Sequence, residues 1–147
     1  MTGPSAHLTF LELACRDAAR TPYPREFIDD GRCAALAALF EAIRAAAGGP
    51  LTVLSAYRTP EHNRSRAVGG APKSQHVQGR ALDLRPPAGM AVAQFYALIA
   101  GRHRDGLLPG LGGIGRYRTF VHVDIRQASK LVAWSGGAQR KEDTETT

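Results

Sequence analysis

Regularly spaced apolar residues mark one clearly amphipathic segment, residues 34–47. Its apolar side chains recur at helical spacing and form one stripe: Leu36, Leu39, Phe40, Ile43 and Ala47. Asp29 or Asp30 can cap the start of this helix, and the Gly-Gly-Pro sequence at 48–50 ends it. The pattern predicts a long helix whose apolar face belongs to the core.

Three further helices are predicted from weaker signals. An early helix is expected over 10–19, where it stops before two closely spaced prolines. Thr59 followed by Pro60 is a helix start, because a hydroxyl cap precedes a proline at the first helical position. This helix should run to about Val68, before a pair of glycines, and another is expected over 90–101.

Short β-branched or alternating segments predict the strands. They lie at 51–57, 80–85, 113–117, 120–126 and 131–134. In the fourth segment the alternation places valine and isoleucine on one face and His122, Asp124 and Arg126 on the other. Helices come first and closely spaced strands dominate the C-terminal part, which favours an α+β fold with a small, mostly antiparallel sheet flanked by helices.

The length of the sequence limits the number of domains, and its net charge limits the kind of partner. The 147 residues fit one domain, expected over 1–138 and as a monomer, followed by a disordered tail at 139–147 that contains no hydrophobic residue. The net charge of +6 indicates an anionic partner, such as nucleic acid, an acidic membrane surface or an anionic cell-wall polymer. The low aromatic content of 7% and the lack of a recognition-helix or zinc-finger pattern argue against nucleic acid.

Other features bear on the compartment. The sequence contains no apolar run long enough for a transmembrane helix. Its first residues lack the basic and apolar regions of a Sec signal peptide, so we expect a cytoplasmic or phage-associated protein, or one exported by another route. Cys15 and Cys33 are too few for a disulfide scaffold and too far apart for a metal knuckle, which favours two buried thiols and leaves a single disulfide open.

Two histidines lie where a functional group is expected. His76 precedes a glycine that permits a sharp turn, and Asp83 follows on a predicted strand, so the two side chains can meet. His122 lies on the polar face of another strand. Two histidines and one aspartate form the three-ligand set of a catalytic zinc site with a vacant fourth position. The same residues are also common on polar strand faces without a metal, so spacing alone leaves both interpretations open.

Three sequence blocks carry a resemblance to a known family. They are Ser-Ala-Tyr-Arg-Thr-Pro-Glu-His-Asn at 55–63, Ser-Gln-His-Val-Gln-Gly-Arg-Ala-Leu-Asp at 74–83, and Gly-Ile-Gly-Arg-Tyr at 113–117 followed by Phe-Val-His-Val-Asp at 120–124. In these blocks the chain resembles the zinc D-alanyl-D-alanine carboxypeptidases and related peptidoglycan endopeptidases, whose fold is similar to that of the hedgehog signalling domain. The resemblance implies that fold, and one Zn²⁺ ion held by His76, Asp83 and His122.

The resemblance also implies roles for other residues. Arg58 should face the site and bind a substrate carboxylate or a developing oxyanion. Ser74 can bind substrate or orient its loop, and Tyr117 is a candidate for substrate binding or polarisation. Several related enzymes carry an acidic base three residues before the last ligand, where this sequence has Thr119. Asp124 can therefore be the general base, or it can orient a ligand imidazole.

These implications lead to one expected function and one alternative. The expected function is hydrolysis of stem-peptide amide bonds in peptidoglycan or muropeptides, with the cell wall as the site of action. The alternative is a non-catalytic module that binds zinc or peptidoglycan, for example a phage structural component, because the acidic residue is missing at Thr119. Trp134 can line the cleft, although a core position is favoured.

Overall fold

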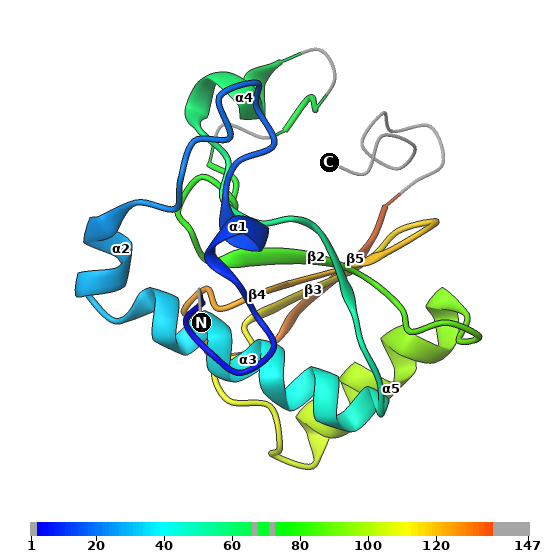
Figure 1. Ribbon diagram of the computed structural model, residues 1–147. Helices are drawn as coiled ribbons and strands as arrows, with labels where there is room; N and C mark the ends of the chain where they lie inside the picture. Colours follow the sequence, from blue (N-terminus) through cyan, green and yellow to red (C-terminus); the bar gives the residue numbers. More distant parts are fainter. Residues whose placement is uncertain (1–2, 66–67, 71–72, 137–147) are drawn as a thin grey trace.

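The computed structural model describes residues 3–65, 68–70 and 73–136, and it confirms the α+β class (Figure 1). The helices are α1 (Phe10–Leu13), α2 (Arg25–Asp29), α3 (Arg32–Ala47), α4 (Pro60–Arg64) and α5 (Val92–Arg104). The strands are β1 (Thr52–Ser55), β2 (Ala81–Arg85), β3 (Gly113–Arg116), β4 (Val121–Asp124) and β5 (Val132–Ser135). The tail expected at 139–147 lies outside the described residues.

The strands form one mixed sheet in the order β1-β2-β4-β3-β5. The pairs β1–β2, β2–β4 and β3–β4 are antiparallel, but β5 runs parallel to β3. The prediction of a small, mostly antiparallel sheet therefore agrees with three strand pairs, but the sheet is mixed because of the parallel β3–β5 pair at one edge. Residues 125–131 connect the end of β4 to the start of β5 across the end of β3 that begins at Gly113. Val132 pairs with Gly113, so β5 begins beside the start of β3 and runs in the same direction.

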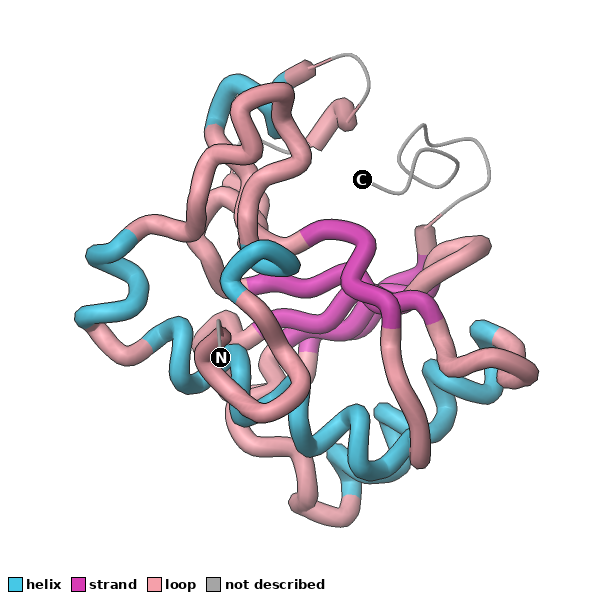
Figure 2. Tube along the Cα trace, in the orientation of Figure 1, coloured by secondary structure: helices cyan, strands magenta, loops and turns pink. Residues whose placement is uncertain are grey.

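The sheet has two chemically different faces because side chains alternate along each strand. One face contributes apolar side chains to the core: Leu82, Leu84, Ile114, Val121 and Val123. Helices α3 and α5 pack over this face, as Figure 2 shows, and add Leu36, Phe40, Ile43, Phe95 and Ile99 to the core. The alternate positions of β2 and β4, including Asp83 and His122, lie on the other face, away from α3 and α5.

Helix α3 follows the predicted amphipathic pattern closely. The N-cap residue is Gly31 rather than the predicted Asp29 or Asp30, but Asp30 lies one residue earlier and its Oδ1 accepts a hydrogen bond of 3.1 Å from the Arg32 backbone N–H. Gly48 ends the helix in the left-handed conformation, with φ of 78°, which glycine adopts without strain. The stripe of buried residues on α3 supplies much of the core beneath the sheet.

Two predicted helices are shorter than expected. Helix α1 ends at Leu13 instead of residue 19, because Ala14 is extended and the Arg16 guanidinium caps the Glu12 and Ala14 carbonyls while also bonding to Val53 O. Helix α4 ends at Arg64 rather than near Val68, because the backbone turns into an extended conformation immediately afterwards. The bond from Arg16 to Val53 O holds the segment after α1 against β1.

Two remaining predictions concern the cysteines and membranes. Cys15 and Cys33 are buried free thiols, which confirms the favoured interpretation. Among the described residues, no helix has both the length and the apolar character needed to cross a lipid bilayer.

Candidate metal centre

One row of paired residues crosses the whole sheet on its polar face. Ser55 of β1 pairs with Asp83 of β2, and Asp83 pairs with His122 of β4. His122 then pairs with Gly115 of β3, and Gly115 pairs with Trp134 of β5. Paired residues share a face and bring their Cβ atoms within about 5 Å of each other. The register alone therefore places an aspartate, a histidine and a tryptophan in one line.

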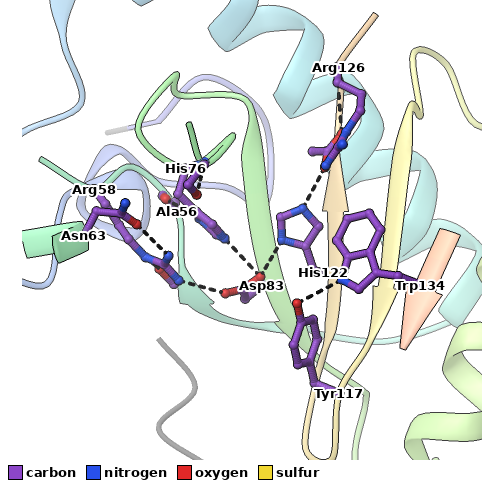
Figure 3. Close-up of polar contacts among 12 residues, drawn as sticks. Ala56, Arg58, Asn63, His76, Asp83, Tyr117, His122, Arg126 and Trp134 are labelled. Carbon is purple, nitrogen blue, oxygen red and sulfur yellow. Dashed lines mark hydrogen bonds and ion pairs between the residues drawn. The ribbon is translucent and has the colours of Figure 1, made fainter. Parts of the chain in front are cut away.

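The predicted ligands His76, Asp83 and His122 converge in this row. His76 enters from the loop before β2, and its Nε2 lies 3.2 Å from Asp83 Oδ1. His122 Nδ1 lies 3.0 Å from the same oxygen, and one ligand atom from each residue falls within 4.8 Å of the others. All three side chains are buried, with exposed fractions of 3%, 2% and 7% for His76, Asp83 and His122. Figure 3 shows the two imidazoles pointing at the carboxylate from different elements.

The outer hydrogen bonds fix which nitrogen of each histidine faces the centre. His76 Nδ1 lies 2.6 Å from the Ala56 carbonyl, which can only accept, so Nδ1 carries the hydrogen and Nε2 is left with a lone pair. His122 Nε2 donates to Asp124 Oδ2 at 2.7 Å, which leaves Nδ1 facing Asp83. Three acceptor atoms thus converge, and a cation between them would relieve their repulsion. Two imidazole nitrogens and a carboxylate oxygen, each held by an outer partner, fit Zn²⁺.

The charges of Asp83 and His76 agree with this donor set, whereas His122 holds its proton more tightly. Burial opposes ionisation of Asp83, but His76 and His122 outweigh it and hold the pKa of this carboxyl below its ordinary value. Burial and the nearby Arg58 guanidinium lower the pKa of His76, which favours the neutral imidazole that binds metals. Burial also disfavours a proton on His122, but its hydrogen bonds to Asp124 and Asp83 raise the pKa of this imidazole. A metal entering the cluster therefore competes with a proton for His122 Nδ1.

Asp124 lies behind His122, on the side away from Asp83. It is fully buried, and Arg126 donates to it from Nη2 at 2.7 Å and from Nε at 2.9 Å. Burial opposes ionisation, but hydrogen bonds from His122 and Arg126 hold the pKa of Asp124 below its ordinary value. The neighbouring position on β3 is Gly113, where an added Cβ would lie 2.6 Å from Asp124 Oδ1. The glycine thus leaves room for the carboxylate that orients His122.

Arg58 lies on the opposite side of the cluster and faces it, as the resemblance implies. The side chain is buried and donates to Ser55 Oγ at 3.2 Å and to Asn63 Oδ1 at 3.1 Å. Its Nη2 lies 3.4 Å from Asp83 Oδ2, the oxygen not directed at the histidines. Arg58 therefore balances the charge of Asp83 in addition to facing the site.

The two expected substrate-binding residues occupy different positions. Ser74 Oγ accepts a hydrogen bond of 3.1 Å from the His76 backbone N–H and so shapes the turn that carries this ligand. The Tyr117 ring stacks on Phe120 with centroids 4.7 Å apart, and its hydroxyl accepts from Trp134 Nε1 at 2.9 Å. Thr119, at the position of the missing acid, is exposed.

Trp134 belongs to this site and not to the core that sequence reasoning favoured. Its ring centroid lies 5.2 Å from that of His122, and the indole is half-buried on the edge strand β5. An added Cβ at Gly115 would lie 2.5 Å from the indole, so the glycine allows Trp134 to approach His122. The alternation of glycines in Gly113-Ile114-Gly115 was the one sequence signal that could have indicated large neighbours on this face.

Comparison with known proteins agrees with the geometry. The sequence model of a family described as Peptidase M15 matches residues 6–124, which include all three candidate ligands. A comparison with curated proteins finds no significant match. Because the matched segment covers most of the sequence, the chain belongs to the Peptidase M15 family of zinc peptidases, which includes D-Ala-D-Ala carboxypeptidases.

Proposed function

We propose that this protein is a zinc-dependent peptidase that hydrolyses an amide bond in peptidoglycan stem peptides, as a D-alanyl-D-alanine carboxypeptidase or an endopeptidase. The observation that carries the proposal is the convergence of His76 Nε2, Asp83 Oδ1 and His122 Nδ1 in a buried cluster. Family membership supports peptidase chemistry. The sequence blocks shared with D-alanyl-D-alanine carboxypeptidases and the net charge of +6 support an anionic cell-wall substrate.

The chain's own residues hold and orient the metal-binding atoms. Zn²⁺, when bound, supplies Lewis acidity toward a water molecule and toward the carbonyl of the scissile amide. The Ala56 carbonyl and the Asp124 carboxylate keep His76 and His122 in the required tautomers and ring orientations. Arg58 supplies positive charge beside Asp83, where it can bind a substrate carboxylate or a developing oxyanion.

Asp124 has an orienting role in this proposal rather than that of the general base. Both of its oxygens already accept hydrogen bonds, Oδ2 from His122 and Arg126 and Oδ1 from Arg126. The side chain is also fully buried and contacts His122 at Nε2, whereas Asp83 faces Nδ1 of the same ring. Proton abstraction by Asp124 would require these bonds to break.

The same observation favours a second candidate, a non-catalytic module that binds zinc or peptidoglycan. Asp124 is committed to His122 and Arg126, and the exposed Thr119 cannot replace the acid found there in several related peptidases. A phage structural component at the cell wall is one setting for such a module.

One experiment separates the two candidates. Purified protein is analysed for zinc and incubated with peptidoglycan and with defined stem peptides, with and without chelator, and products are identified by mass spectrometry. The peptidase predicts stoichiometric zinc and a shortened peptide that disappears with chelator. Zinc without any released product supports the binding module.

A matched pair of variants tests the ligand assignment. His76→Ala should lose zinc and hydrolysis together, whereas His103→Ala, a histidine in the last turn of α5, should keep both. Full zinc content and hydrolysis in His76→Ala would contradict the proposed centre.

A further inference from the structure

We propose that Trp134 is a specificity-determining residue whose indole contacts an aliphatic side chain of the substrate beside the scissile amide. The inference rests on the proposed peptidase function and adds the chemistry of one substrate position. Trp134 lies beyond residues 6–124, so the family match does not account for it.

Trp134 lies beside the candidate ligand His122. Its ring centroid lies 5.2 Å from that of His122, and β5 is the edge of the sheet farthest from β1. Arg58 follows β1 and approaches Asp83 from the other side, so Figure 3 shows Arg58 and Trp134 flanking the candidate ligands. A peptide bound across the centre would meet a guanidinium on one side and an indole on the other.

The glycine next to Trp134 in the cross-sheet row gives the indole room near His122. Gly115 stands between His122 and Trp134 in the cross-sheet row, and a Cβ at this position would lie 2.5 Å from the indole. Because Gly115 has no side chain, the indole leans over β3 toward His122. The tryptophan is thus held beside the metal-binding atoms, although it belongs to an edge strand whose other residues are exposed.

The part of the indole that is open to a ligand is apolar. Its one polar atom, Nε1, already donates to the Tyr117 hydroxyl at 2.9 Å. The Arg126 guanidinium lies 5.1 Å from the ring centroid and contributes a cation–π contact. The half-buried remainder of the indole is hydrocarbon and π surface, which favours an aliphatic group over a polar one.

A substrate series tests this assignment. Stem-peptide analogues that differ at one residue flanking the scissile amide, alanine or glycine, are compared by kcat/KM. We expect the wild type to prefer the alanine peptide by about tenfold, the lower end of the discrimination that one buried carbon provides. Trp134→Ala should reduce this ratio to near one through a raised KM, with unchanged zinc content. Gly115→Ala, which displaces the indole without removing it, should act in the same direction.

Controls separate a substrate contact from mere support of His122. Ser135→Ala, on the same strand and exposed, should keep the wild-type ratio. If Trp134→Ala loses zinc, or slows both peptides equally so that the ratio stays at its wild-type value, the indole only supports the ligand and the assignment is overturned.

A binding measurement keeps the inference testable even if no peptide is cleaved. Trp134 is the one tryptophan of the sequence, so tryptophan emission reports on this position alone. Titration of the zinc-loaded protein with the alanine peptide should change the emission more strongly, and at lower concentration, than titration with the glycine peptide. A response without cleavage supports the contact while refuting the peptidase proposal, and identical titrations overturn the contact.

Discussion

Asp83 and His122 are paired residues of antiparallel β2 and β4, and this pairing places Asp83 Oδ1 3.0 Å from His122 Nδ1. The contact depends on strand register, since a shift by one residue would turn either side chain to the opposite face of the sheet. His76 joins them from the preceding loop. The rigid part of the candidate centre is therefore the Asp83–His122 pair, which makes Asp83 the most informative residue to alter.

Asp83→Asn should abolish tight zinc binding. The substitution removes the anionic ligand and leaves the buried Arg58 guanidinium without its carboxylate partner. We expect zinc affinity to fall by at least 100-fold, and stability to fall by about 3 kcal/mol, the order found when one partner of a buried ion pair is removed. Competition with a chromogenic chelator measures the first effect and urea unfolding the second. A variant that retains wild-type zinc affinity would exclude Asp83 as a ligand.

Removing the orienting carboxylate should weaken zinc binding without abolishing it. Asp124→Asn keeps the shape of the side chain but loses the charge that pairs with His122 and Arg126. A loss of about 10- to 100-fold in zinc affinity is expected, as for other outer partners of ligating histidines. Asp105→Asn, at the exposed end of α5, is the matched control and should bind zinc like the wild type. If Asp124 were only a general base, hydrolysis would fall while zinc affinity stayed constant.

Two glycine substitutions test the packing around Asp124. Gly113→Ala would bring a Cβ into the Asp124 carboxylate, whereas a Cβ at Gly49 meets no atom within 4 Å. We expect Gly113→Ala to cost about 1–3 kcal/mol, the usual range for overpacking, and to lower zinc affinity. Gly49→Ala should leave both nearly unchanged. Thermal unfolding with and without zinc measures the difference, and equal effects of the two substitutions would contradict a tight fit at β3.

Chelation should lower the thermal stability of the protein. A ligand that binds only the folded state stabilises it by about 4 kcal/mol when present at 1,000 times its Kd. EDTA should therefore lower Tm, and added zinc should restore it. The effect should be absent from His76→Ala, whose Tm we expect to be insensitive to zinc. A wild-type Tm that does not change with either chelator or zinc would argue against a metal centre in the folded protein.

A contact far from the centre provides a pH-dependent prediction. Glu41 on α3 accepts hydrogen bonds from Ser5 Oγ and the His7 backbone N–H, both at 2.7 Å. Burial opposes ionisation of Glu41, but the hydrogen bonds from Ser5 and from the side chain and backbone of His7 outweigh it and lower the pKa of the carboxyl. A lowered folded-state pKa means that the contact stabilises the protein above the ordinary glutamate range, near pH 4 to 5, and that this stabilisation is lost as the pH falls.

Glu41→Gln should accordingly lower the stability at neutral pH by less than about 1 kcal/mol, because the side chain is partly exposed to solvent. The difference from the wild type should shrink as the pH falls through the ordinary glutamate range and disappear only below the lowered pKa of Glu41. Urea unfolding at several pH values checks this, and a constant difference at all pH values would show that the charge of Glu41 does not matter.

Much of the fold was predictable because its signals are local. The apolar stripe of α3, the Thr59–Pro60 start of α4 and the alternation in β4 each depend on neighbouring residues. The predicted end of the early helix was wrong for the opposite reason. Its end depends on Arg16, which bonds to Val53 O some 37 residues away, and no local pattern encodes that contact.

The candidate ligands could be predicted from the sequence, but the position of Trp134 beside them could not. The spacing of His76, Asp83 and His122 left a metal-free strand face open, and the sequence blocks that resemble the zinc peptidases singled out the three residues. The place of Trp134 depends on a parallel pairing of β3 with β5, which a short connection after β4 does not suggest. Without that register, an isolated tryptophan near the C-terminus resembles a core residue.

The two ligand histidines differ in how easily mutation can disturb them. His76 is oriented by the main-chain carbonyl of Ala56, which every amino acid at that position would still provide. His122 depends on the side chain of Asp124, which a single codon change can remove. At the fully buried position 56, the small substitution Ala56→Gly should therefore keep the orientation of His76, whereas Asp124→Ala removes the partner of His122, and zinc titration of the two variants would show this asymmetry directly.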